Sequence, residues 1–247
     1  MKRYNSVLNI FVHWCQLVKM EIRELIIFSH KINEQDDFYR NVLEFRCSRV
    51  TNSILEIHTG DTKLILEKST KKFFYHFAFL IPTGSLNAAI DYLEKKSIQL
   101  LLLNGEKVIQ FNSGRAIYFY DKDGNIAEFI ERPTLNNQSG SDFSIESIIK
   151  LNEIGLPVSE PKNMTRILTT EFGIKPIKNA PFTDRFCWVG DYNGAVIVIK
   201  EGRNWLPTQK PGIINDFSIK YMDQGKEYNL TFANNEITNS SNTPNLH

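Results

Sequence analysis

The sequence predicts an α+β fold in which a module of one strand, one helix and three short strands is repeated. Three observations support this prediction. Apolar runs with the composition of strands recur about every 50–65 residues, a period too long for a solenoid and suited to duplicated modules. A segment with helical spacing of its apolar residues follows each of the first three runs. Turn-forming Gly, Asp and Asn residues separate the short strands. A third module and a truncated fourth complete the chain.

The first module begins near residue 21. Residues 21–31, EIRELIIFSHK, are predicted as a strand because β-branched isoleucines are frequent in them. A helix is predicted over 34–44, where Phe38 and Val42 lie on one face. Three short strands are expected next, around FRCSRV, ILEIHT and KLILEKS.

The second module repeats this order. A strand is predicted over 73–82 and a helix over 85–97. The turn DKDGN at 121–125 is a strong hairpin signal, because Asp, Asn and Gly tolerate positive φ angles. The short strands are expected near 98–102, 106–111, 115–120 and 126–131.

The third module follows a polar linker. A strand is predicted within 145–157 and a helix over 162–172, ended by Gly173. Strands are expected around FCWVGD and AVIVIKEG, followed by the segment GRNWLPTQKPG. A last strand, NDFSIKYM, begins the truncated fourth unit.

Composition excludes several classes of function. The net charge of +1 gives no general attraction to nucleic acids or membranes, so neither is expected as a partner. Three scattered cysteines without a CxxC pattern argue against a disulfide framework or a structural zinc site. They favour a reducing, cytoplasmic location. A small-molecule ligand is the expected partner, and a monomer and a homodimer are both compatible with the sequence.

Four segments are predicted. Residues 1–19 form an N-terminal extension with an apolar run too short to span a bilayer, and Met20 is an alternative start. Residues 20–133 hold two paired modules, and 143–233 hold a second, incomplete domain. Residues 234–247 are polar and without period, so a disordered tail is expected.

Three motifs resemble one superfamily. DDFYRNVLEF (36–45), HFAFLI (76–81) and YFYDKDGNIAEF (118–129) are similar to the first helix, the first strand and the closing hairpin of vicinal oxygen chelate proteins. This superfamily includes glyoxalase I, extradiol dioxygenases and bleomycin resistance proteins. EIGLPV and GRNWLPT are similar to further segments of its members. The resemblance implies βαβββ modules that form a cupped mixed sheet with helices outside. It does not specify the chemistry, because one fold hosts many functions.

The resemblance also implies a metal site. Carried over to this sequence, its ligand positions fall on Glu24, His76 and Glu128. Carboxylate and imidazole donors suit Mn, Fe, Ni or Zn. In the superfamily such a metal chelates two neighbouring substrate oxygens, so a lyase, isomerase or extradiol-type dioxygenase is expected, with Glu24 as the catalytic base.

Other residues are expected around this site. The predicted substrate-binding side chains are Arg115, Tyr118, Tyr120 and Trp205. In the third unit Glu153 stands at a ligand position, but the last strand offers no matching carboxylate, so this unit is expected to supply a wall of the pocket.

Two alternatives stay open. The first is a metal-free binding protein of the bleomycin-resistance type, with a cavity lined by Phe79, Tyr118 and Trp205. The second is a structural module without a cavity.

Overall fold

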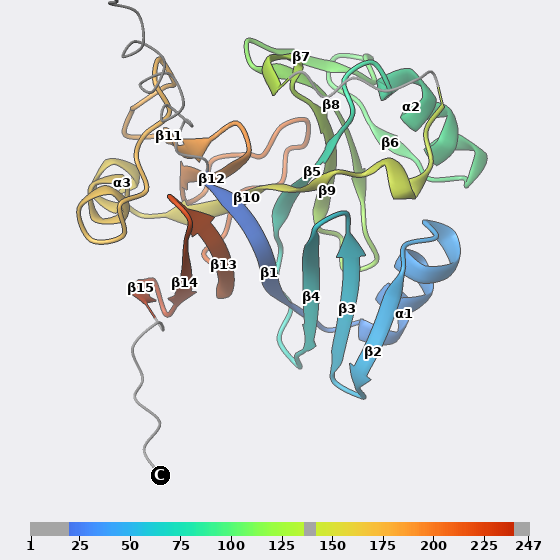
Figure 1. The fold of residues 1–247 in the computed structure, drawn as a ribbon, viewed down its shortest axis with the longest axis horizontal. Helices are drawn as coiled ribbons and strands as arrows, with labels where there is room; N and C mark the ends of the chain where they lie inside the picture. The colour runs from blue at the N-terminus through green and yellow to red at the C-terminus, as the bar shows by residue number, and fades with distance from the viewer. Residues whose placement is uncertain (1–19, 136–141, 240–247) are drawn as a thin grey trace, which may run out of the picture.

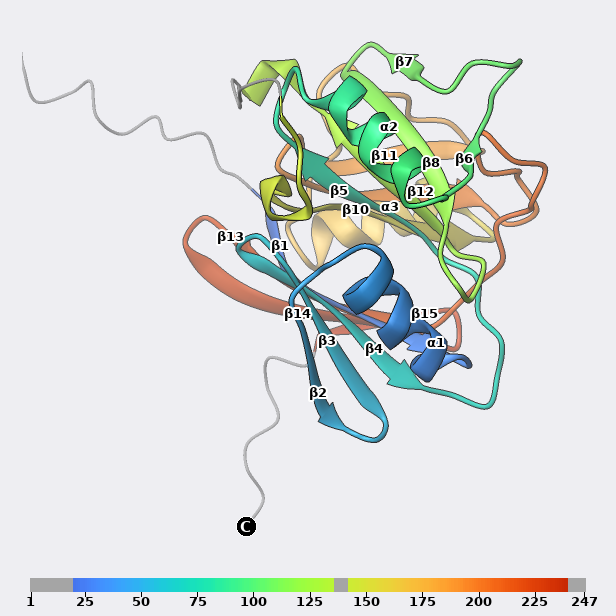
Figure 2. The ribbon, with the colours of Figure 1, turned by 90° about the vertical axis from the view of Figure 1, so that its right-hand side faces the viewer.

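Two mixed β-sheets form the structure, a computed structural model that describes residues 20–135 and 142–239. The seven-stranded sheet runs, from edge to edge, β15 (Glu236–Asn239), β14 (Lys226–Ala233), β13 (Phe217–Asp223), β1 (Glu21–Ser29), β4 (Thr62–Lys68), β3 (Ile54–Thr59) and β2 (Cys47–Thr51). The eight-stranded sheet runs β11 (Phe186–Asp191), β12 (Gly194–Lys200), β10 (Lys150–Val158), β5 (His76–Ile81), β9 (Ile126–Glu131), β8 (Gly114–Tyr120) and β6 (Leu100–Leu101), and β7 (Ile109–Phe111) pairs with β8. Figure 2 shows the two sheets as two layers.

Three α-helices accompany these sheets, as the sequence predicts (Figure 1). They are α1 (Ile32–Asp37), continued by a π-helical turn over Phe38–Val42, α2 (Leu86–Lys95) and α3 (Pro161–Thr170); short 3₁₀ turns cover Pro133–Leu135 and Ile145–Ser147. The α+β class and the modular order of elements are therefore confirmed. No helix in the described ranges is long and apolar enough to cross a membrane.

The pairing of the modules differs from the sequence prediction. Strand β1 opens the first module and lies antiparallel to β13 of the fourth unit. Strand β5 opens the second module and lies antiparallel to β10 of the third. Each sheet therefore combines one module from residues 20–133 with one from the C-terminal part. The first two modules, which the sequence analysis paired with each other, lie in different sheets.

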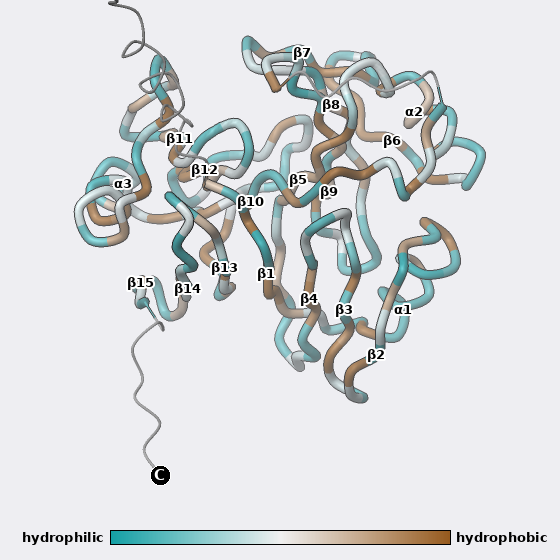
Figure 3. Tube along the Cα trace, viewed as in Figure 1, coloured by the Kyte–Doolittle hydropathy of each residue, from teal (hydrophilic) through white to brown (hydrophobic). Residues whose placement is uncertain are grey.

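A shared apolar core holds the sheets together. Alternate residues of a strand point to opposite faces, and on β5 the fully buried Phe77 and Phe79 face this core. Leu25 of β1 and Ile219 of β13 enter it from the other sheet, and Leu168 of α3 belongs to the same cluster. In Figure 3 the tube around β8 and β9 is largely hydrophobic in colour, in agreement with their nearly complete burial.

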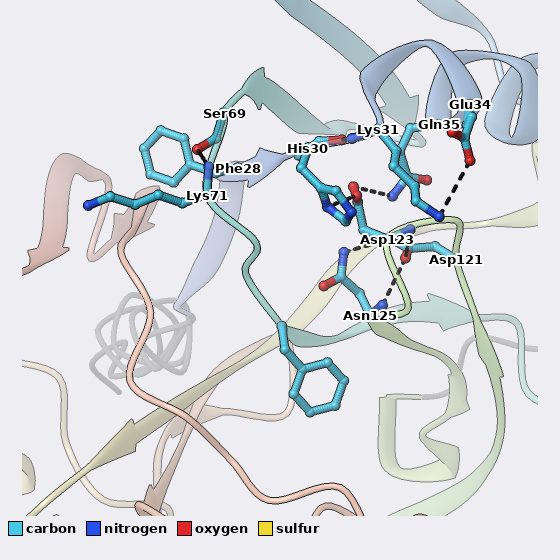
Figure 4. Close-up of polar contacts among 12 residues, drawn as sticks. Phe28, His30, Lys31, Glu34, Gln35, Ser69, Lys71, Asp121, Asp123 and Asn125 are labelled. Atoms are coloured by element: carbon cyan, nitrogen blue, oxygen red, sulfur yellow. Dashed lines mark hydrogen bonds and ion pairs between the residues drawn. The ribbon is translucent and has the colours of Figure 1, made fainter.

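A polar contact also ties the second module to the first. Figure 4 shows His30 and Gln35 pointing toward Asp123 in the turn between β8 and β9. His30 Nδ1 lies 2.7 Å from one Asp123 oxygen, and Gln35 Nε2 donates to the other at 2.8 Å. Asp121 accepts hydrogen bonds from the backbone N–H groups of Asp123 and Asn125 and so holds the turn in shape. The DKDGN motif thus closes a hairpin and also joins the two sheets.

The fourth unit is a three-stranded meander without a helix. Gln224 and Gly225 connect β13 and β14 with positive φ angles, and Asn234 and Asn235 do the same before β15. Such two-residue turns match the twist of paired strands. Residues 236–239 form an edge strand, so the prediction of a disordered tail over 234–247 is wrong for these residues. Residues 1–19 and 240–247 lie outside the described residues.

Candidate functional site

A cavity of about 600 Å³ opens on the face of the eight-stranded sheet that is turned away from the shared core. Side chains alternate between the two faces along a strand. The residues next in sequence to the core residues therefore line the cavity. The five central strands contribute His76 from β5, Tyr118 from β8, Glu128 from β9, Glu153 from β10 and Ile197 from β12. Trp205 and Leu206, from the segment after β12, cover one side of the cavity.

His76 and Glu128 form a buried pair in this cavity. His76 Nε2 lies 2.9 Å from Glu128 Oε2, and the two residues are 7% and 1% exposed. The Trp205 ring packs against the imidazole, with 4.7 Å between the ring centroids. Burial and the neighbouring Glu128 raise the pKa of the Tyr118 phenol well above its usual value, so this hydroxyl stays protonated beside the carboxylate. The structure therefore brings together two of the three predicted ligand residues.

Arg132 and Glu153 form a second buried ion pair. Arg132 Nη2 donates to Glu153 Oε1, and Arg132 Nε donates to Asn152 Oδ1 at 2.8 Å. The guanidinium lies over the Trp188 and Tyr192 rings, 4.9 and 5.6 Å from their centroids, and its Nη1 has no hydrogen-bond partner among the described residues. Burial raises the pKa of the Glu153 carboxyl to about 7; Arg132 opposes this rise, and Glu128 adds to it.

Glu24 does not reach this site. It lies on β1 in the seven-stranded sheet, where Lys220 of β13 is 3.2 Å from its carboxylate. The prediction placed Glu24 beside His76 because it paired the first two modules with each other. In the structure β1 pairs with β13 and β4, so its side chains belong to the other sheet. A base role for Glu24 at this cavity has no support in this geometry.

The predicted substrate-binding residues divide into two groups. Tyr118 and Trp205 line the cavity. Arg115 instead binds the buried Glu131 at 2.6 Å, and that carboxylate also accepts the backbone N–H groups at the start of α2. Tyr120 lies under Lys210, with 3.9 Å from Nζ to the ring centroid, and is absent from the lining. Phe79, expected in the cavity of the binding-protein alternative, faces the shared core.

The donor set does not fit a metal centre of the predicted kind. Within the described ranges, no three His, Cys, Asp or Glu side chains are grouped so that they could hold one ion. His76 and Glu128 bind each other, and Glu153, the third potential donor, is bound by a guanidinium. A fixed positive charge beside the donors opposes the approach of a cation.

Sequence reasoning missed several residues of the site. The Arg132–Glu153 pair joins the end of the second module to the first strand of the third, and only the antiparallel pairing of β5 with β10 brings them together. One signal was present, because Arg132 continues the alternation of Glu128 and Ile130 toward the cavity. Trp188 and Arg203 also line the cavity. Arg203 lies in the GRNWLPT segment, from which only Trp205 was predicted to bind substrate, and no motif covers Trp188.

Comparisons with known proteins agree at the level of the fold. No model of a protein family matches the sequence, and no protein with a curated description matches it. Among solved structures, a dioxygenase candidate from Bacillus subtilis is similar, with 16% identity, a TM-score of 0.53, and coverage of 85% of this chain and 68% of that one.

Shorter neighbours match about half of the chain. A lactoylglutathione lyase from Agrobacterium tumefaciens has 16% identity and a TM-score of 0.39, with 44% of this chain and 92% of that one covered. A glyoxalase/bleomycin resistance protein/dioxygenase from Alicyclobacillus acidocaldarius has 14% identity and a TM-score of 0.38, with 45% and 91% covered. The likeness to the Bacillus subtilis structure is one of fold, and this fold agrees with the repeated βαβββ modules that the motifs of the sequence predict.

Proposed function

We propose that this chain binds a small molecule in the cavity of the eight-stranded sheet without a metal ion held by its own side chains. One observation carries the proposal: each histidine and carboxylate side chain that lines the cavity already binds another protein side chain. His76 binds Glu128, and Arg132 binds Glu153. Both pairs are buried, and polar or charged groups in such an environment are stable when they are paired.

The dimensions and lining of the cavity support the same proposal. Its volume of about 600 Å³ lies within the range usual for sites of small organic ligands. Aromatic rings form much of the wall, among them Tyr118, Trp188 and Trp205. Polar and charged side chains, among them Gln110, Asn112 and Arg203, make up about half of the lining. The aromatic wall can bury a ligand, and such polar groups can fix its orientation.

Metal analysis tests the first half of the proposal. Wild type purified without a chelating tag is loaded in turn with Mn, Fe, Ni and Zn, dialysed and analysed beside His76→Ala and Glu128→Ala. We expect no stoichiometric metal in any of the three proteins. One equivalent in wild type that disappears in both variants would overturn the proposal and support the metal-dependent lyase or dioxygenase, which acts on two neighbouring oxygens of its substrate.

Ligand binding tests the second half. The uncharged probe N-phenyl-1-naphthylamine is expected to bind wild type with a stoichiometry of one, followed by its own fluorescence. Replacement of Ile197 by tryptophan should weaken this binding about tenfold or more, because the larger ring fills the floor of the cavity, and tenfold corresponds to about 1.4 kcal/mol.

Val50→Trp is the matched control for the added indole, because Val50 is 54% exposed and lies on β2, far from the cavity lining. It should leave probe binding unchanged. Equal binding by wild type and both variants would place the probe outside the cavity and contradict the proposal.

A further inference from the structure

Two positive side chains at the cavity are left without a negative partner. Arg203 is half-buried in the cavity wall, and Lys178 is exposed at the cavity. Within the part of the chain that the structure describes, neither makes an ion pair with an acidic side chain. The Arg203 guanidinium lies over the Phe186 ring at 5.1 Å. Burial and the nearby Arg185 lower the pKa of Arg203, so its positive charge stands in an unfavourable setting.

The acidic side chains of the cavity do not compensate these charges. Glu128 is paired with His76, and Glu153 is paired with Arg132. Both carboxylates are buried. Without His76, the lining carries three basic side chains against two carboxylates, a net charge of +1, and the two basic side chains that make no ion pair with a described residue are Arg203 and Lys178. Since a half-buried charge is screened less by water and salt than an exposed one, it attracts a complementary group more strongly.

The walls beside these cations are aromatic. Phe111, Phe186 and Trp188 line the cavity together with Tyr118 and Trp205. Aromatic side chains prefer offset or edge-to-face contact with other rings. The Arg203 guanidinium lies over one of these rings, Phe186, so the aromatic wall and the positive charge are adjacent.

We infer that the ligand of this cavity is an aromatic molecule with an anionic group, whose ring lies among the tryptophans and whose carboxylate or sulfonate oxygens bind Arg203, with Lys178 adding charge. This inference rests on the proposed function and names the class of ligand for the same site. A guanidinium suits such a group because it presents parallel N–H donors to two oxygens.

A pair of probes with one ring skeleton tests the inference. 8-Anilinonaphthalene-1-sulfonate carries the anionic group, and N-phenyl-1-naphthylamine lacks it. Arg203→Gln should weaken binding of the sulfonate about tenfold, which is about 1.4 kcal/mol. Binding of the uncharged probe should change less than twofold. Added sodium chloride should weaken binding of the sulfonate alone, because salt screens charge and not apolar contact.

Arg185→Gln is the matched control, because Arg185 is exposed and lies near Arg203 without lining the cavity. It should leave sulfonate binding within twofold of wild type. Unchanged urea midpoints would show that all variants are folded. If Arg203→Gln weakens both probes equally, or if both arginine variants weaken the sulfonate equally, the inference is overturned while the proposed function stands. If neither probe binds wild type, the proposed function itself fails.

Discussion

Replacement of Arg132 by methionine should destabilise the folded chain by about 3–5 kcal/mol, the usual cost of breaking a buried ion pair by removing one partner. Arg132 is 1% exposed and is the only cation bound to Glu153 among the described residues. Methionine keeps much of the packing against Trp188 but leaves the Glu153 carboxylate buried without a counterion. Urea unfolding at pH 8 measures the loss.

The double variant Arg132→Met/Glu153→Gln separates charge from packing. Without the carboxylate, the loss of Arg132 should cost much less, so the two single effects should not add. A loss below about 1 kcal/mol in Arg132→Met, or strict additivity in the double variant, would contradict a buried ion pair at this site.

The loss of stability in Arg132→Met should depend on pH in a defined direction. The pKa of Glu153 is about 7 in the folded chain, above its ordinary value of 4.5. A raised carboxyl pKa favours the neutral form in the folded state, so its contribution to stability falls as pH rises from about 4.5 through 7. Without Arg132 the charged form is still less favourable. The destabilisation of Arg132→Met should therefore be larger at pH 8 than at pH 5.5.

Replacement of Gly60 by alanine should cost about 2–4 kcal/mol, from strain at a positive φ combined with a steric overlap. Gly60 has a φ of +59° in the turn between β3 and β4, and an added Cβ would overlap the carbonyl oxygen of Ile149. That oxygen cannot retreat freely, because the Ile149 N–H is bonded to Leu80 of β5 at 2.9 Å. The midpoint of urea unfolding measures the effect.

Gly105→Ala is the matched control. Gly105 also has a positive φ, +88°, but no atom lies within 4 Å of the position of its Cβ. It should cost about 1 kcal/mol from the backbone term alone. Equal losses in the two variants would show that the contact between the β3–β4 turn and Ile149 does not restrict the backbone.

Local patterns were sufficient to predict most elements of the fold. The turn at 121–125 and the apolar run at 76–81 depend on residues close in sequence, and both lie in the structure where they were expected. The sequence does not predict strand β15, because its turn, Asn234–Asn235, lies in a polar segment without period. A polar strand at a sheet edge shows little alternation of apolar residues. The informative signal in the sequence is therefore the pair of asparagines, because asparagine tolerates the positive φ angles of a hairpin turn.

The candidate site was predictable only within one module. His76 and Glu128 lie on β5 and β9, adjacent parallel strands of the second module, and a family motif covers each of them. Glu153 depends on which strand lies beside β5, and Glu24 depends on which lies beside β1. The choice among several similar strands is decided by the packing of whole sheets and leaves no local trace in the sequence.

The pairing of β1 with β13 has a consequence for synthesis on the ribosome. Strand β1 is among the first described segments to emerge, and its partner follows almost 200 residues later. Until then one edge of β1 exposes unpaired backbone groups, which are a template for association with other chains. Neither sheet can be completed from residues 20–133 alone. The nascent chain must therefore keep the open edge of β5 soluble until β10 has been translated, and the open edge of β1 until β13 has been translated.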